Sequence, residues 1–235
     1  MKPQKKQIKK SKEEEVLKFQ AILPFGPTII KGKLPENLVK LVDDKATSML
    51  KDKKLVKEFD HSGQLAGNVK QEIRFPSEWM NTPEFLPMVH VISEMVKQYI
   101  SIPPASETIT PDYVGKMVIE SMWFVSQWSG DFNPFHIHEG QLSGVFYLRV
   151  PPSLPEEYAQ EDHYPTVGDI VWFDGRASTF SGHKFQQSPE VGDIFLFPNW
   201  LAHGVYPFRT KNEERRSVSF NLHLIKKEEE KQLLK

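Results

Sequence analysis

Near its C-terminal end the chain carries the stretch GDIFLFPNWLAH, residues 192–203, which decides the fold class. A Gly-Asp turn opens an apolar run, a Pro-Asn pair closes it, and a histidine follows. Other short runs rich in β-branched and aromatic residues, bounded by Gly, Pro and Asp, lie at 122–128, 143–150, 169–173 and 217–225. Strands so closely spaced leave little room for helices. Residues 112–225 are therefore predicted to form an antiparallel sandwich or jelly roll, a mainly β fold.

Two amphipathic helices are predicted before this region. Apolar residues recur at helical spacing after Pro35, which predicts a helix over residues 35–51. A second helix is predicted over residues 83–100, with Thr82 as its N-cap. We expect both helices to pack on the outside of one sheet.

The chain divides into four predicted segments. Six Lys and three Glu in residues 1–15 predict a mobile charged arm, and residues 226–235 a charged C-terminal tail. Between them, residues 16–111 form a helical and mixed N-terminal elaboration that packs on the β domain of residues 112–225. The proline-rich stretch 101–111 is the predicted boundary.

Composition narrows the classes of function. The chain has 235 residues, with 30 Lys and Arg against 31 Asp and Glu, so no net positive field favours nucleic acid or an anionic membrane. Without cysteine, any metal site must use histidine and carboxylate ligands. The sequence shows neither a membrane helix nor a signal peptide. We expect a cytoplasmic protein that acts on a small molecule or a peptide, as a monomer or a homodimer.

Three histidines form a candidate metal site. His136 and His138 lie two residues apart, so in an extended strand both imidazoles point to the same face. His203 follows the apolar run of residues 193–197. Further on, Arg215 and Ser217 share the polar face of an alternating strand, as an ordinary half-exposed strand would also show. If that face lines the same interior as the histidines, the guanidinium there can bind a carboxylate bidentately.

Taken together, these motifs resemble the Fe(II)/2-oxoglutarate-dependent dioxygenases, in particular a prolyl-4-hydroxylase-like group with relatives in bacteria and marine phages. The resemblance rests on the ordered set of H-x-H, distal His and R-x-S, and covers most of residues 112–225. It implies a double-stranded β-helix with iron held by His136, His138 and His203. It also implies that Arg215 and Ser217 bind the distal carboxylate of 2-oxoglutarate. Such enzymes use O2, release succinate and CO2, and hydroxylate an aliphatic C–H bond. For this chain the resemblance suggests peptidyl proline as one candidate substrate among others. The expected location is the cytoplasm of a cell or of a phage-infected host.

One position departs from the family pattern. The usual motif is H-x-D or H-x-E, whereas this chain has His138 at the second position. Three neutral imidazoles leave one more positive charge at the metal, which should strengthen 2-oxoglutarate binding. Glu139 is the alternative ligand, but only if the strand bulges there. Two other functions stay open: a cupin-like module that holds a metal without turnover, and a three-His dioxygenase that uses no 2-oxoglutarate.

The remaining histidines and four of the tryptophans are predicted to be structural. Surface or capping roles are expected for His61, His90, His163 and His183, and a structural role for His223. Core and rim positions are expected for Trp123, Trp128, Trp172 and Trp200.

Overall fold

The computed structural model describes residues 18–22, 26–64, 67–69, 71–102, 105, 113–160, 163, 165–176, 179 and 182–233. The predicted arm of residues 1–15 lies outside them, as does most of the predicted boundary at 101–111.

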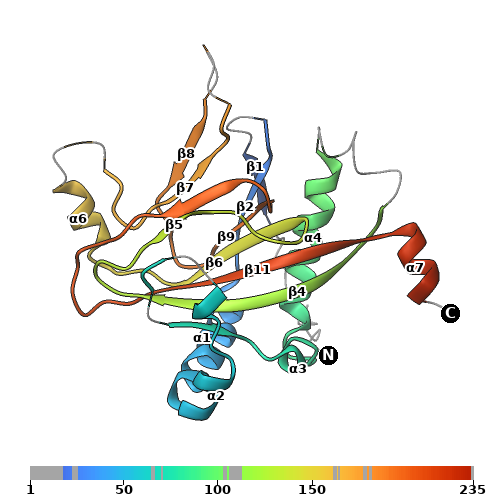
Figure 1. Ribbon diagram of the computed structural model, residues 1–235, viewed down its shortest axis with the longest axis horizontal. Coiled ribbons are helices and arrows are strands. Elements are labelled where there is room, and N and C mark those ends of the chain that lie inside the picture. Colours follow the sequence, from blue (N-terminus) through green and yellow to red (C-terminus); the bar gives the residue numbers. More distant parts are fainter. Residues whose placement is uncertain are drawn as a thin grey trace, which may run out of the picture.

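Strands dominate the described chain (Figure 1). They are β1 (Phe19–Ile22), β2 (Ile29–Lys33), β3 (Gln71–Arg74), β4 (Tyr113–Gln127), β5 (Asn133–His136), β6 (Leu142–Arg149), β7 (Ile170–Phe173), β8 (Lys184–Gln187), β9 (Asp193–Pro198), β10 (Ala202–Val205) and β11 (Arg215–Lys226). The helices are α1 (Glu36–Lys51), α2 (Lys53–Glu58), the short η1 (Ser62–Gln64), α3 (Ser77–Met80), α4 (Leu86–Ser101), α6 (Leu154–Ala159) and α7 (Lys227–Leu233).

The strands form two antiparallel sheets. The larger has the order β1-β2-β9-β6-β11-β4-β3, and the smaller has the order β5-β10-β7-β8. Most neighbours in both sheets are strands that are not consecutive in the sequence, as in a jelly roll. The predicted mainly β fold with flanking helices is confirmed, and the architecture is a double-stranded β-helix.

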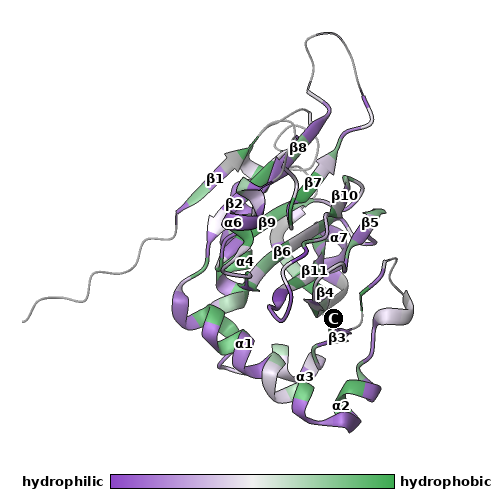
Figure 2. Ribbon diagram, turned by 90° about the vertical axis from the view of Figure 1, so that its left-hand side faces the viewer, coloured by the Kyte–Doolittle hydropathy of each residue, from purple (hydrophilic) through white to green (hydrophobic). Residues whose placement is uncertain are grey.

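Strand β11 shows how alternation separates the core from the site. Val218, Phe220 and Leu222 are fully buried in a core cluster shared with α1 and α4. Arg215 and Ser217 point to the opposite face, which lines a cavity between the two sheets. Figure 2 shows hydrophobic and hydrophilic residues alternating along α1, as expected for a helix with one buried side.

Two glycine turns position strands on either side of the cavity. Gly168 and Gly192 adopt left-handed backbone conformations, with φ of 66° and 84°. Such values favour glycine because a side chain would be strained there. Each turn leads directly into a buried strand, β7 or β9, as the paired Gly-Asp sequences predicted.

The helix predictions hold with one correction. Helix α1 begins one residue after the predicted start, and α4 ends one residue after its predicted end. The N-cap of α4 is Phe85, however, and not Thr82. The Thr82 hydroxyl instead donates to the carbonyl of Trp79, which closes the turn after α3.

The N-terminal residues contribute strands as well as helices. Strand β2 pairs with β9, and β3 pairs with β4, so residues 16–111 supply one end of the large sheet and its opposite edge. In the C-terminal tail, residues 227–233 form α7, whose Glu229 contacts the imidazole of His223. Within the described residues, no helix is both long and apolar enough to cross a membrane.

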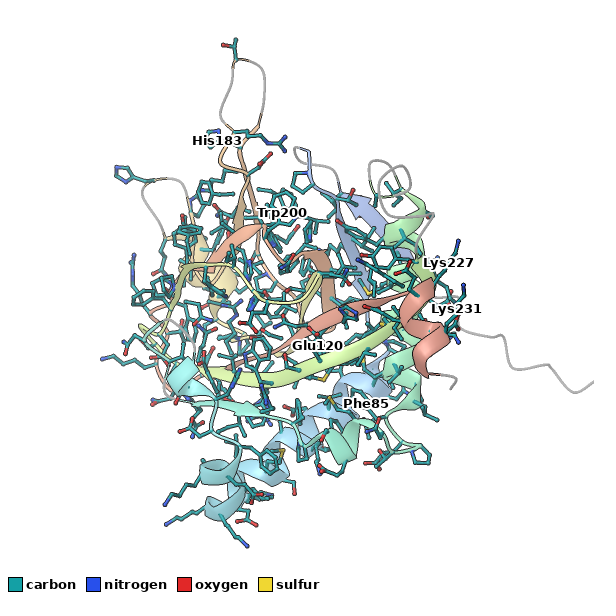
Figure 3. All side chains as sticks on the ribbon, turned by 45° about the vertical axis from the view of Figure 1, so that its right-hand side comes forward. Phe85, Glu120, His183, Trp200, Lys227 and Lys231 are labelled. Carbon is teal, nitrogen blue, oxygen red and sulfur yellow. The ribbon has the colours of Figure 1, made fainter. Side chains whose placement is uncertain are left out.

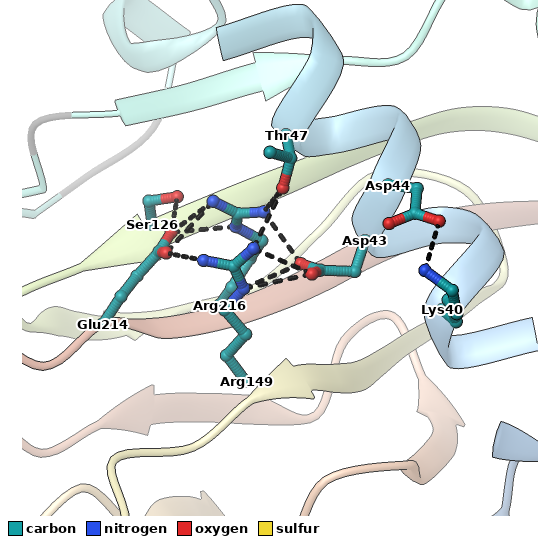
Figure 4. A network of polar contacts seen from close by, with 8 residues as sticks. All are labelled: Lys40, Asp43, Asp44, Thr47, Ser126, Arg149, Glu214 and Arg216. Carbon is teal, nitrogen blue, oxygen red and sulfur yellow. Dashed lines mark hydrogen bonds and ion pairs between the residues drawn. The ribbon is translucent and has the colours of Figure 1, made fainter.

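A charged network joins α1 to the sheet (Figure 4). Arg216, only 3% exposed, donates to Glu214 and to Asp43 of α1. Arg149 of β6 donates to the same two carboxylates, so two positive groups face two negative ones. Because each charge has an opposite partner, the network avoids the large penalty of an unpaired buried ion. It fixes α1 beside the strand that carries Arg215.

Candidate functional site

Two short strands bring the three histidines together. His203 of β10 lies directly opposite His136 of β5, and His138 follows two residues after His136. Their ring centroids are 4.5 to 5.0 Å apart. One ring nitrogen from each histidine lies within 4.8 Å of the others, a spacing that allows a single metal ion to bind all three.

Backbone carbonyls orient two of these rings. His136 Nδ1 lies 2.7 Å from the carbonyl oxygen of Pro134, and His203 Nδ1 lies 2.9 Å from that of Leu201. Since a carbonyl only accepts hydrogen bonds, each Nδ1 carries the proton and each Nε2 keeps a free lone pair. The Nε2 atoms of His138 and His203 are 3.1 Å apart. This donor set fits a divalent transition metal.

Burial keeps the three imidazoles neutral. It lowers the pKa of His136, and it lowers the pKa of His138 to about 3 with a further contribution from His136. The pKa of His203, which is 5% exposed, lies well below its ordinary value for the same reason. Neutral imidazole is the form that binds metals, so protons do not compete for this site near neutral pH.

Asn199 holds the backbone at His138. The Asn199 side-chain amide donates to the His138 main-chain carbonyl at 3.1 Å. The Asn199 main-chain carbonyl accepts from the His138 backbone amide at 3.0 Å. Asn199 directly follows Pro198, the last residue of β9. Because His138 lies beyond the last residue of β5, this pair of bonds replaces the sheet pairing that would otherwise fix it.

Across the same cavity lies a buried guanidinium. Arg215 is 1% exposed and donates to Gln127 Oε1 at 3.2 Å and to the Tyr147 hydroxyl at 3.1 Å. It forms no ion pair with any residue that the structure describes, and its Nε has no hydrogen-bond partner. A buried cation held only by neutral groups lacks the anion that would compensate its charge. Ser217 follows two residues later on the same face and is also buried.

The histidines, Arg215 and Ser217 line one cavity. Two further polar atoms in its wall, Gln127 Nε2 and Asn133 Oδ1, are buried without a hydrogen-bond partner. Buried polar atoms are normally satisfied, so this wall is built for a polar ligand. Sequence reasoning missed Gln127, Asn133 and Tyr147. Of these three, only Gln127 could have been identified, and only if its pairing with Arg215 across the two strands had been known.

The other predictions have mixed outcomes. Glu139 is exposed and is not part of the histidine cluster. The surface role predicted for His61 is wrong, because that side chain is buried and its ring packs 5.2 Å from the Trp123 ring. His183 does lie outside, on the β7–β8 hairpin (Figure 3).

The tryptophans divide between core and rim as predicted. Trp172 lies in the core between the sheets, and Trp123 lines the cavity 5.6 Å from the His138 ring. Trp128 and Trp200 are exposed, and Trp200, labelled in Figure 3, lies in the turn before β10.

The comparison with known families agrees with this geometry. Residues 121–221 match a family model described as "Putative 2OG-Fe(II) oxygenase", where 2OG is 2-oxoglutarate. This match identifies residues 121–221 as a 2OG-Fe(II) oxygenase region. The match covers β11 up to Asn221 and includes all three histidines, Arg215 and Ser217. The 2OG-Fe(II) oxygenases are oxidoreductases that use Fe(II), 2-oxoglutarate and O2, so the chain is a 2-oxoglutarate-dependent oxygenase.

Solved structures share the fold of this oxygenase at low sequence identity. A prolyl-4-hydroxylase from Pseudomonas putida is 14% identical, with 85% of this chain and 92% of that chain covered and a TM-score of 0.52. An alpha-ketoglutarate-dependent epimerase from nogalamycin biosynthesis is 13% identical, with 85% and 79% covered and a TM-score of 0.54. A carbocyclase from the same biosynthesis is 15% identical, with 86% and 80% covered and a TM-score of 0.53. No curated protein matches the sequence.

Proposed function

We propose that this oxygenase hydroxylates an aliphatic C–H bond, with iron held by His136, His138 and His203. In this proposal Arg215 and Ser217 bind the distal carboxylate of 2-oxoglutarate. The observation that carries it is one cavity with three neutral imidazoles at one end and a buried guanidinium without an anion in its wall.

The chain's own residues have defined tasks in this reaction. Bound iron supplies the redox chemistry, which couples decarboxylation of 2-oxoglutarate to oxidation of the substrate. The carbonyls of Pro134 and Leu201 hold two imidazoles in the tautomer that presents Nε2. Arg215, itself oriented by Gln127 and Tyr147, fixes the cosubstrate through charge-assisted hydrogen bonds.

Tyr147 contributes in two ways. Its ring lies under the guanidinium, with the Arg215 Cζ 5.0 Å from the ring centroid. Burial raises the pKa of the Tyr147 hydroxyl, while Arg215 lowers it. The hydroxyl stays protonated near neutral pH, so it can donate to a carboxylate while accepting from Arg215.

Arg215 distinguishes this proposal from its two rivals. A cupin-like module that only holds a metal does not need a buried, unpaired guanidinium in its cavity. A three-His dioxygenase without 2-oxoglutarate does not need one either. If Arg215→Ala removes 2-oxoglutarate binding while the metal stays bound, both rivals are excluded.

Peptidyl proline is the first substrate class that we propose to test. A solved neighbour named prolyl-4-hydroxylase shares the fold, but so do neighbours named epimerase and carbocyclase. Selectivity therefore depends on residues around the cavity and not on the shared strands. Succinate formation with and without a panel of Pro-containing peptides tests this class, and equal rates argue against proline.

An anaerobic titration tests the function itself. Addition of Fe(II) and 2-oxoglutarate to the protein should give the weak visible metal-to-ligand charge-transfer band of such complexes. Exposure to O2 should then yield succinate. If a metal-loaded sample shows neither the band nor succinate, the proposal is wrong.

A further inference from the structure

Strand β3 carries a buried carboxylate that has no partner among the residues the structure describes. Glu72 is 3% exposed, and its Oε1 has no hydrogen-bond partner. It forms no ion pair with any residue in the described part of the chain. Even Arg74, two residues further along the strand and on the same face, is not paired with it.

The register places this carboxylate on the cavity face of the sheet. Glu72 lies directly opposite Val125 of β4, and Val125 lines the cavity that holds the histidines. Directly opposed residues share a face of the sheet. The next pair, Ile73 and Phe124, points the other way into the core behind the sheet. Glu72 therefore faces the same side of the sheet as Val125, on β3, which is an edge strand of the large sheet.

Nearby contacts link this position to the metal site. The backbone amide of His61 donates to the Glu72 carbonyl at 2.8 Å. The His61 ring packs on Trp123, and Trp123 packs on His138. On the side towards β5, Asn68 pairs with Phe132 just before the strand that carries His136. Glu72 thus lies at the edge of the sheet, beside Val125, which lines the cavity.

A carboxylate in such a place needs a reason. Burying an ionisable group without a partner is unfavourable, so such a group calls for an explanation, and a bound ligand is one. Burial, together with the negative charge of Asp60, raises the pKa of Glu72 to about 7. Near neutral pH the group is therefore partly protonated, and an arriving cation would favour its charged form.

We propose that Glu72 is a substrate-binding residue, and that the substrate presents a positively charged nitrogen, an ammonium or a guanidinium, to its carboxylate. The proposal rests on the oxygenase function proposed above, because it requires the substrate to occupy the cavity that Val125 and the three histidines line. It narrows the substrate class to basic molecules, such as a lysine, an arginine or a peptide that contains one.

Binding to a protein that cannot turn over tests the proposal directly. The full chain is loaded with Zn(II) and 2-oxoglutarate, and dissociation constants are measured from shifts in melting temperature. The probes are L-arginine and L-lysine, each paired with an uncharged analogue of similar shape, L-citrulline and Nε-acetyl-lysine. The variants are Glu72→Gln and the control Glu78→Gln, which removes the charge of an exposed glutamate on α3.

We expect at least one of the cations to bind the wild-type protein and Glu78→Gln more tightly than its uncharged analogue does. In Glu72→Gln its dissociation constant should rise at least tenfold, and the preference over the analogue should disappear. With Fe(II), the same cation should stimulate succinate formation by the wild-type protein and not by Glu72→Gln.

Three results overturn the inference: no cation binds, the uncharged analogues bind equally well, or Glu72→Gln binds the cation like the wild type. The charge-transfer band with Fe(II) and 2-oxoglutarate is recorded for every variant. Its absence from the wild-type protein contradicts the proposed function. A normal band without a preference for cations contradicts only the role of Glu72.

Discussion

Replacing Arg215 by methionine separates cosubstrate binding from metal binding. Methionine has a similar length and no charge, so it fills the space beside Tyr147 without offering hydrogen bonds. The three histidines lie on other strands and keep their own orienting bonds to Pro134 and Leu201. We therefore expect the variant to bind metal like the wild type and to lose its affinity for 2-oxoglutarate.

The size of this loss follows from the burial of Arg215. Removing one partner of a buried, hydrogen-bonded charge pair weakens binding by about 2–5 kcal/mol, or roughly 30-fold or more in dissociation constant. Without ligand, removal of an uncompensated buried charge is favourable, but Gln127 Oε1 and the Tyr147 hydroxyl lose a donor. These effects oppose each other, so we expect the ligand-free variant to stay within about 2 kcal/mol of the wild-type stability.

Thermal unfolding of the Zn(II)-loaded protein measures both quantities. At 2-oxoglutarate concentrations of about 100 times its dissociation constant, the ligand stabilises the wild type by about 2.7 kcal/mol. For a chain of this size that corresponds to a rise in melting temperature of about 5–10 °C. Arg215→Met should show almost no rise at the same concentration. If its melting temperature rises as much as that of the wild type, Arg215 does not bind the cosubstrate and our assignment of the cavity is wrong.

Three further predictions concern individual residues. If His138 is a ligand, His138→Asp should still bind iron but with a shifted charge-transfer band. If His138→Asp instead behaves like the wild type and Glu139→Ala loses the metal, Glu139 is the ligand. Asn199→Ala should weaken Zn(II) binding about tenfold, because the His138 carbonyl loses its amide donor. An unchanged Zn(II) affinity in a competition titration would show that the backbone bond from His138 to Asn199 is enough to hold His138 in place. The pKa of Glu72, raised to about 7 from its ordinary 4.5, means that the folded state binds the proton more tightly. The wild type should therefore lose stability as the pH rises from about 4.5 through 7. Glu72→Gln should be more stable than the wild type at pH 8 by up to about 3 kcal/mol, and equal to it at pH 4. If urea unfolding gives the same difference in free energy of unfolding between the two proteins at both pH values, this prediction is wrong.

Local patterns in the sequence were enough to predict the main strands and the faces on which several polar side chains lie. Alternation along β11 separates the apolar face of Val218 and Phe220 from the polar face of Arg215 and Ser217, and the structure agrees. The spacing of His136 and His138 likewise predicts a shared direction. The Gly-Asp turns predict where β7 and β9 begin, because glycine favours the positive φ found there. Each of these properties depends on residues within a few positions of one another.

Contacts between distant segments required the tertiary structure. Gln127 and Tyr147 hold Arg215 although they lie 88 and 68 positions away, and Asn199 holds His138 from 61 positions away. No local pattern encodes such contacts, because they depend on which strands pair and in what register. The same holds for Glu72, an ordinary glutamate in the sequence. Only its pairing with Val125 buries its carboxylate on the cavity side of the sheet, where solvent can no longer compensate its charge.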